Sequence, residues 1–172
     1  MSSSVCLVAS ILSKDKNKID QVVQLLIDRY GEIFFISQFF EFPNPEYYAP
    51  EMGMPLYRRL VAFKNLISDE RLAIIKKACI SLEKDLAVNA KRVANIDPGI
   101  LSSQAFILAS TKDSPHRVPL SLGIKAETTL MYHHGQFHAL PWTYPDYASK
   151  EYIEMLTHIR TRYLWYSKEK HD

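Results

Sequence analysis

The chain has 172 residues, of which 47% are hydrophobic and 23% charged, a composition typical of a folded globular chain rather than a disordered one. The net charge is only +2, so nothing indicates general nucleic-acid binding, which requires a clustered basic excess. No apolar run reaches the roughly 18–20 residues that span a membrane. The two cysteines, Cys6 and Cys79, lie in apolar stretches, which favours a reduced setting. We therefore expect one cytoplasmic domain over residues 1–172.

Hydrophobic patterning predicts an alternation of strands and helices in the first 99 residues. An apolar run at the start is typical of a buried strand, and apolar residues spaced by three and four, ended by Gly31, predict a helix. Residues 43–55 are rich in proline and predict a long functional or packed loop. In chain order, we expect strands at 5–12, 33–42, 58–64 and 92–97, a helix ending near Tyr30, a helix after Ser68 and a turn at Asp97-Pro98-Gly99.

The remaining residues, 100–172, predict an extension. Residues 103–110 fit a helix or a strand, whereas 124–132 alternate as a strand with Leu130 and Tyr132 on the same side as Ile124. His134-Gly135 suits a hairpin turn, and Ser149 suits the cap of a final helix. The whole pattern predicts an α+β fold, with a ferredoxin-like βαββαβ sheet over residues 1–99 and a C-terminal β-hairpin and helix over 100–172.

Nucleotide-binding loops of the common kinds are absent from the sequence. None of the five glycines begins a P-loop, and no two form the G-x-G of a dinucleotide-binding loop. The sequence therefore predicts no particular cofactor, and binding of a divalent metal ion stays an alternative.

Polar side chains gather in three parts of the sequence. Asn95 and Asp97 share one face of a strand end, residues 112–117 combine acids with cations, and Glu127 lies opposite the apolar face of its strand. Arginine grips oxyanions, histidine transfers protons near neutral pH, and carboxylates hold Mg²⁺ or act as bases. The predicted catalytic residues are His116 as proton donor with Asp97 and Glu127; the predicted ligand-binding residues are Arg92, Asn95, Lys112, Asp113 and Arg117.

Each of these residues also has a structural interpretation. Asp97 would cap its turn, Asp113 would pair with Lys112 or Arg117, and Glu127 would face water. In the functional interpretation, Asp97, Asp113 and Glu127 would together hold a divalent ion or supply a base.

An aromatic and proline-rich segment at 140–147 precedes the last predicted helix. Trp142 and Tyr144 would either form the wall of a ligand pocket or pack over a sheet edge. We include both among the candidate ligand-binding residues.

Several strings together resemble one family. They are Y-Y-x-x-E-M-G from Tyr47, N-x-D-P-G from Asn95, K-D-x-x-H-R from Lys112 and L-P-W-T-Y-P-D-Y from Leu140. They are similar to a prokaryotic family of unknown function whose members are often labelled "GTP-binding protein". The resemblance covers nearly the whole chain and implies a single-domain cytoplasmic protein, but brings no activity. One departure is Ile100, where the family usually has tyrosine.

Two classes of function follow from these observations. The first is binding of a small anionic ligand, phosphorylated or nucleotide-like, in a pocket of Asp, Glu, Arg and His, which in its catalytic form would be a metal-dependent phosphate hydrolase or transferase. The second is a non-catalytic protein-interaction or regulatory module. The sequence does not decide whether the protein is an enzyme, nor its oligomeric state, and it predicts no membrane partner.

Overall fold

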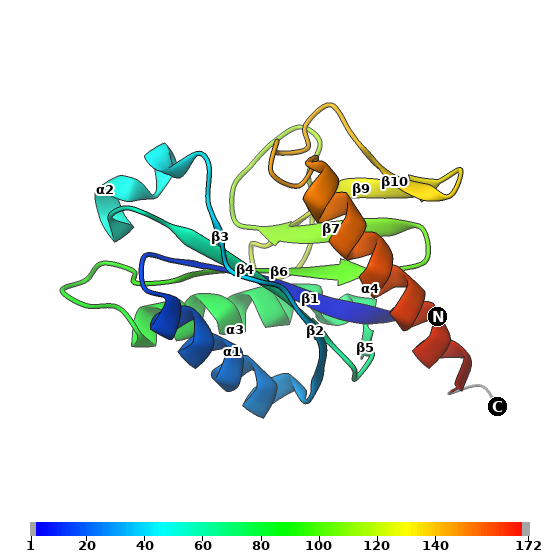
Figure 1. Cartoon of the computed structure of the whole chain (residues 1–172), viewed down its shortest axis with the longest axis horizontal. Helices are drawn as coiled ribbons and strands as arrows, with labels where there is room; N and C mark the ends of the chain where they lie inside the picture. The colour runs from blue at the N-terminus through cyan, green and yellow to red at the C-terminus, as the bar shows by residue number, and fades with distance from the viewer. Residues whose placement is uncertain (1–2, 170–172) are drawn as a thin grey trace.

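In the computed structural model, which describes residues 3–169, one antiparallel sheet of ten strands runs through the protein in the order β10-β9-β7-β6-β1-β4-β2 (Figure 1). The strands of this path are β1 (Ser4–Ser13), β2 (Ile33–Ile36), β4 (Tyr57–Phe63), β6 (Asn95–Leu101), β7 (Ala105–Ser110), β9 (Lys125–His133) and β10 (Gln136–Ala139). The short strands are β3 (Phe40–Glu41) on β4, β5 (Ile67–Ser68) on β1 and β8 (Val118–Pro119) on β9.

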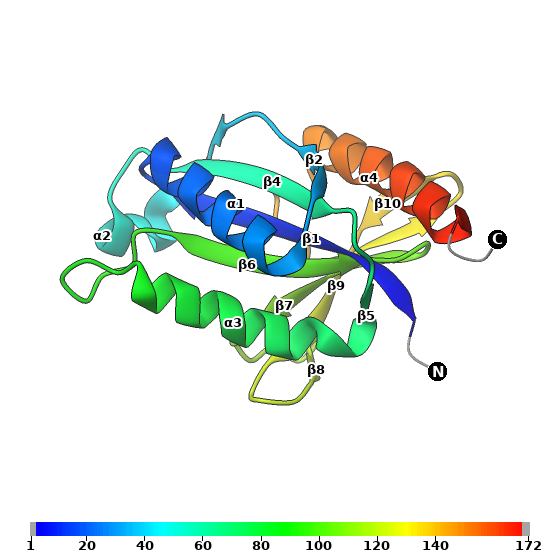
Figure 2. The ribbon, with the colours of Figure 1, turned by 90° about the horizontal axis from the view of Figure 1, so that it is seen from below.

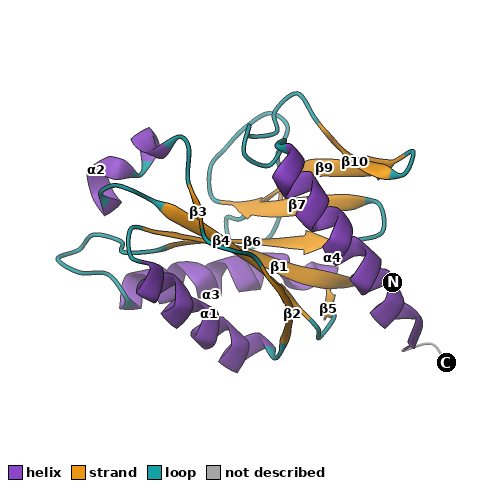
Figure 3. Ribbon diagram, viewed as in Figure 1, coloured by secondary structure: helices purple, strands orange, loops and turns teal. Residues whose placement is uncertain are grey.

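Helices cover both faces of this sheet (Figures 2 and 3). Helices α1 (Lys16–Tyr30) and α3 (Leu72–Asp85) lie on one face, α4 (Lys150–Glu169) lies on the other, and the short α2 (Ala49–Met52) follows a 3₁₀ turn at Pro45–Tyr47. None of the helices within residues 3–169 combines the length and the apolar character needed to cross a membrane. The coarse expectation of an α+β fold is therefore confirmed.

Strand β1, in the interior of the sheet, separates two hydrophobic cores, as its continuous apolar sequence predicts. Alternate side chains of a strand point to opposite faces, so Leu7 and Ile11 pack with α1 and α3, whereas Cys6 and Val8 pack with α4. All four are buried. Helix α4 is also tied to the start of β1, because the Tyr163 hydroxyl donates to the Ser4 carbonyl oxygen at 2.9 Å.

Several local signals have the predicted effect. Gly31, with φ of +94°, ends α1, and the Ser149 hydroxyl accepts from the backbone N–H of Tyr152 at the start of α4. His134 and Gly135 both have positive φ, as a two-residue hairpin turn requires, and they connect β9 to β10. The segment 103–110, whose pattern fits either a helix or a strand, contains strand β7.

The predicted turn at Asp97-Pro98-Gly99 is wrong. Strand β6 continues through it to Leu101, with Pro98 opposite Ala9 of β1. On its other side, β6 pairs with β7 only from Gly99 onwards. In an antiparallel strand, the backbone groups of every second residue point to the same side. The backbone of Pro98 therefore points toward β7, where it has no N–H to donate. The two strands consequently separate at Pro98.

Two other expectations are corrected by pairing between strands. The predicted strand 33–42 is interrupted, because β2 ends at Ile36 and β3 begins at Phe40. In β9 the pairing with β7 skips Thr129, which is a β-bulge. Beyond this bulge the faces are exchanged, so Leu130 packs with α4 whereas Ile124 packs with α1 and α3, and the two do not share a face as predicted.

Candidate functional site

A cavity of about 810 Å³ opens where β6 and β7 separate. Its floor comes from the ends of these two strands and from α3, and its walls from the segments 42–48 and 144–147. The polar residues that line it are Asn44, Glu46, Tyr47, Tyr48, Arg58, Lys76, Glu83, Lys84, Arg92, Asn95, Asp97, Ser110, Thr111, Lys112, Arg117, Glu127, Tyr144, Asp146 and Tyr147. This size, with a mixture of apolar and charged walls, is that of a small-molecule site.

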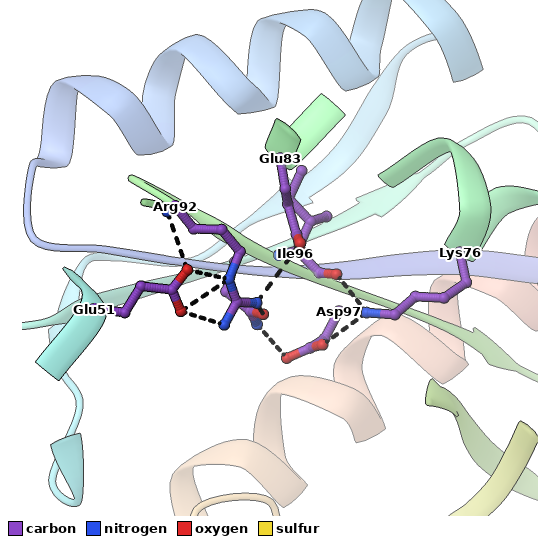
Figure 4. A network of polar contacts seen from close by, with 7 residues as sticks. Glu51, Lys76, Glu83, Arg92, Ile96 and Asp97 are labelled. Carbon is purple, nitrogen blue, oxygen red and sulfur yellow. Dashed lines mark hydrogen bonds and ion pairs between the residues drawn. The ribbon is translucent and has the colours of Figure 1, made fainter. Parts of the chain in front are cut away.

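Side chains of α3 complete the unpaired edge of β6 (Figure 4). The backbone N–H of Ile96 donates to Glu83 Oε1 at 2.7 Å, and the Ile96 carbonyl oxygen accepts from Lys76 Nζ at 2.9 Å. A buried backbone group without a partner is costly, so these two side chains replace the hydrogen bonds that β7 no longer supplies. The edge of the strand is therefore stable while the cavity remains open.

Asp97 lies on this edge with its carboxylate in the cavity wall. Its Oδ1 accepts from Lys76 Nζ at 3.1 Å and its Oδ2 accepts from the side-chain amide of Asn95 at 2.8 Å. Burial alone would raise the pKa of Asp97, but the charges of Lys76 and Arg58 and the two hydrogen bonds outweigh it, and the pKa is lowered. Asp97 is therefore an anion and a hydrogen-bond acceptor at neutral pH.

Arg58 of β4 forms the deep wall of the cavity. Its side chain is only 4% exposed, pairs with Asp146 and lies 4.5 Å from the centre of the Phe42 ring. Burial would lower its pKa, but Tyr152, Tyr147 and Asp146 raise it, so the guanidinium stays charged.

Arg92 connects the segment that contains α2 to the start of β6. Its Nε and Nη2 donate to the Glu51 carboxylate at 3.0 and 2.7 Å, its backbone N–H donates to the same carboxylate, and its Nη1 donates to Asn95 Oδ1 at 3.0 Å (Figure 4). These hydrogen bonds from Arg92 lower the pKa of Glu51. The segment at the cavity wall is thus held by a two-pronged ion pair.

Glu127 of β9 lies at the opposite wall and is only 2% exposed. Its Oε2 accepts from Arg117 Nε and contacts His116 Nε2, both at 2.8 Å. His116 Nδ1 lies 2.8 Å from the Ser114 hydroxyl, and its ring stacks on Trp142 with 4.6 Å between centroids. His116 and Trp142 therefore lie behind Glu127, outside the cavity lining.

The mouth of the cavity carries aromatic and basic side chains. Lys112 Nζ lies 3.6 Å from the centre of the Tyr47 ring, a cation–π contact. Tyr47 is 62% exposed and Tyr144 is 49% exposed, although both line the cavity. Lys84 of α3 is also exposed at this mouth.

The structure brings together seven of the ten residues selected from the sequence. Those lining the cavity are Arg92, Asn95, Asp97, Lys112, Arg117, Glu127 and Tyr144. His116 and Trp142 contact the site only through the Glu127 wall, and Asp113 lies outside the lining.

The metal-binding trio suggested by the sequence is not formed. The side chain of Asp113 is 89% exposed and pairs with Lys125 at 2.7 Å, not with Lys112 or Arg117. Throughout residues 3–169, no three His, Cys, Asp or Glu side chains are placed to hold one ion. Asp97 caps no turn, and Glu127 does not face bulk water, so those structural interpretations are also wrong.

Sequence reasoning missed the charged residues of α3. Lys76 and Glu83 are 6% and 4% exposed, and they share the face of Leu72 and Cys79. The spacing 72, 76, 79, 83 places charged residues within an apolar helical stripe, and this signal could have revealed them. Arg58, at the start of a strand, is a visible charge in the sequence but was not selected as a site residue.

Comparisons with known proteins give a family but no activity. A family model described as "Domain of unknown function (DUF4416)" matches residues 3–163. No curated protein and no solved structure matches the chain significantly.

Proposed function

The chain belongs to the DUF4416 family, a family of unknown function, and from its cavity we propose that it binds a small anionic organic ligand, phosphorylated or nucleotide-like. The observation that carries this proposal is the cavity of about 810 Å³, in which Arg92, before β6, lies with Lys112 and Arg117 of the loop after β7. Arginine and lysine together are the usual partners of phosphate and carboxylate groups.

The balance of charge inside the cavity suggests where the anionic group lies. Arg58, Lys76 and Arg92 are each paired with a carboxylate of the protein. At the mouth, Lys84 and Lys112 form no ion pair with any residue in the described range 3–169. We infer that these two lysines neutralise the anionic group of the ligand.

The exposed tyrosines of the mouth fit a planar part of the ligand. Tyr47 and Tyr144 present aromatic rings on two different walls. Stacking on such rings stabilises a base or another flat group by roughly 1–3 kcal/mol. This feature favours a nucleotide-like ligand over a purely aliphatic one.

The other two functions receive less support. A metal-dependent phosphate hydrolase or transferase would hold Mg²⁺ through one or two carboxylates and the substrate phosphate, but Asp97 and Glu127 each already accept a hydrogen bond from a cationic side chain. A protein-interaction module would use exposed apolar residues such as Val118 and Leu122 near β8, which are 62% and 52% exposed. Stabilisation by a small anion without Mg²⁺ in the screen described below would favour ligand binding over both alternatives.

We also propose that β1, β2, β4 and β6 with α1 and α3 form a ferredoxin-like unit, extended by the later strands and α4. The antiparallel order β6-β1-β4-β2 and the location of both helices on one face support this proposal.

The experiment is a thermal-shift screen of nucleotides, sugar phosphates and dicarboxylates, each with and without Mg²⁺. A ligand at 100 times its dissociation constant adds about 2.7 kcal/mol to the stability of the folded protein, a clear shift in Tm. We expect an anion from this panel to stabilise the protein. The double variant Lys84→Ala, Lys112→Ala should lose this stabilisation. The matched control Lys77→Ala, Lys91→Ala, which replaces two exposed lysines outside the cavity, should keep it. Stabilisation by no anion, or full stabilisation of the double variant, would refute the proposal.

A further inference from the structure

Glu127 presents one of its two carboxylate oxygens to the cavity without a partner. Both of its hydrogen-bonding neighbours, His116 and Arg117, contact Oε2. Within residues 3–169, Oε1 accepts no hydrogen bond, yet it is not among the enclosed polar atoms that lack a partner. Since Glu127 lines the cavity and is otherwise buried, the accessible oxygen is the one that faces the cavity.

The neighbours of Glu127 fix the direction of this oxygen. A carboxylate only accepts hydrogen bonds, so His116 Nε2 carries a hydrogen and donates it to Oε2. His116 is itself held by the Ser114 hydroxyl and by stacking on Trp142. Arg117 is held by the Ser110 hydroxyl and the Lys112 carbonyl oxygen. Oε1 is therefore a pre-oriented acceptor on a rigid strand.

An acceptor in this position restricts the chemistry of the ligand. A carboxylate repels a bare anion, and so does Asp97, whose pKa is lowered. A ligand that reaches this wall must bring hydroxyl or amino groups, while its own negative charge stays at the lysines of the mouth. Simple anions lack such donors.

We propose that Glu127 Oε1 accepts a hydrogen bond from a hydroxyl or amino group of the ligand, which is therefore a hydroxylated or aminated phosphate or carboxylate of the sugar phosphate and nucleotide class. This inference rests on the proposed function and makes it more specific. His116 and Trp142 do not line the cavity, and they act as positioning residues for Glu127.

The test measures dissociation constants by calorimetry for two groups of probes. Ribose 5-phosphate, glucosamine 6-phosphate and AMP carry donors, whereas sulfate and methyl phosphate, both as dianions at pH 8, do not. With the unaltered protein, we expect at least one probe of the first group to bind about tenfold or more tightly than both of the second, because hydrogen bonds to a charged group are strong. Equal binding of the two groups would overturn the inference but leave the proposed function intact. If no probe binds, both fail.

Variants assign the preference to Glu127. Glu127→Gln should reduce the difference between the two groups of probes to less than threefold, because an amide no longer supplies two equivalent acceptors. Asp113→Asn, the same change at an exposed carboxylate outside the cavity, should leave the difference unchanged. His116→Ala should weaken binding of the hydroxylated probes selectively, and His116→Gln, which restores an N–H donor, should recover part of it. A preference that survives in Glu127→Gln would refute the assignment, and the comparison of probes on the unaltered protein decides the inference even if that variant does not fold.

Discussion

Lys76 of α3 and Asp97 of β6 form an ion pair around the unpaired edge of the middle strand of the sheet, with 3.1 Å between Lys76 Nζ and Asp97 Oδ1. Lys76 Nζ also donates to the Ile96 carbonyl oxygen, so one side chain stabilises both a strand edge and a cavity wall. Burial would lower the pKa of Lys76, but Asp97 and Glu83 raise it, and the ammonium group remains charged.

Replacement of Lys76 should be strongly destabilising. Lys76→Met fills similar space but leaves the Asp97 carboxylate and the Ile96 carbonyl without their partner, and such a loss costs about 3–5 kcal/mol. Urea unfolding at pH 7 measures it. Lys77→Met, at the exposed neighbouring position of the same helix, should change the free energy of unfolding by less than about 0.5 kcal/mol. Similar values for the two variants would show that the pair contributes little.

Asp97 should make stability depend on acid pH. Its pKa is lower in the folded protein than its usual value of 3.8, so its contribution is present above that value and is lost as the pH falls through the folded-state pKa. The pKa of Glu83 is raised, mainly by burial, and its contribution has the opposite sign. Asp97→Asn removes only the first contribution. The urea midpoint of this variant should fall less steeply below about pH 4 than that of the unaltered protein, and parallel curves would contradict the prediction.

Loss of the Glu51–Arg92 pair should loosen the segment around α2. Glu51→Gln keeps the shape of the side chain and removes its charge, so the hydrogen bonds from Arg92 weaken. Because both side chains are about a third exposed, we expect a loss of stability no greater than about 1 kcal/mol. Amide hydrogen exchange in residues 43–55 should nevertheless become faster. Glu46→Gln, an exposed residue of the same segment, is the control. Equal amide exchange rates in the two variants would show that the Glu51–Arg92 pair does not restrain this segment.

Gly99 should tolerate no side chain. A Cβ at this position would lie 2.8 Å from Phe106 Cε2 and 2.9 Å from the Ile107 carbonyl oxygen. Gly99→Ala should therefore destabilise the protein by about 1–3 kcal/mol through overpacking. Phe106→Leu removes part of the obstacle, so the double variant should lose less stability than the sum of the two single variants. Simple additivity in urea unfolding would show that the ring is not what the methyl group meets.

The sequence predicts those parts of the fold that depend on neighbours in the chain. The apolar run of β1, the positive φ of His134 and Gly135, and the Ser149 cap each follow from local chemistry. The continuation of β6 through Pro98 depends instead on Glu83 and on β1, which are distant in the chain. The bulge in β9 likewise exists only in its pairing with β7. Neither the continuation of β6 nor the bulge in β9 can therefore be predicted from local sequence patterns.

The residues of the candidate site likewise fall into those that the sequence predicts and those that it does not. Asn95, Asp97 and Glu127 could be selected because polar residues interrupt apolar strands. Arg58 and Lys76 were missed because the burial of a cation depends on partners such as Asp146 and Asp97, which only the folded chain supplies. Asp113 was selected but lies outside the cavity, where it pairs with Lys125. A charge-rich loop alone does not determine which of its residues faces the cavity.

The separation of β6 from β7 has an evolutionary consequence. The opening between the two strands follows from the N–H that Pro98 lacks and from the two hydrogen bonds that α3 supplies to Ile96. Relatives that keep these three features should therefore keep the same backbone frame, even where the side chains on the cavity walls differ.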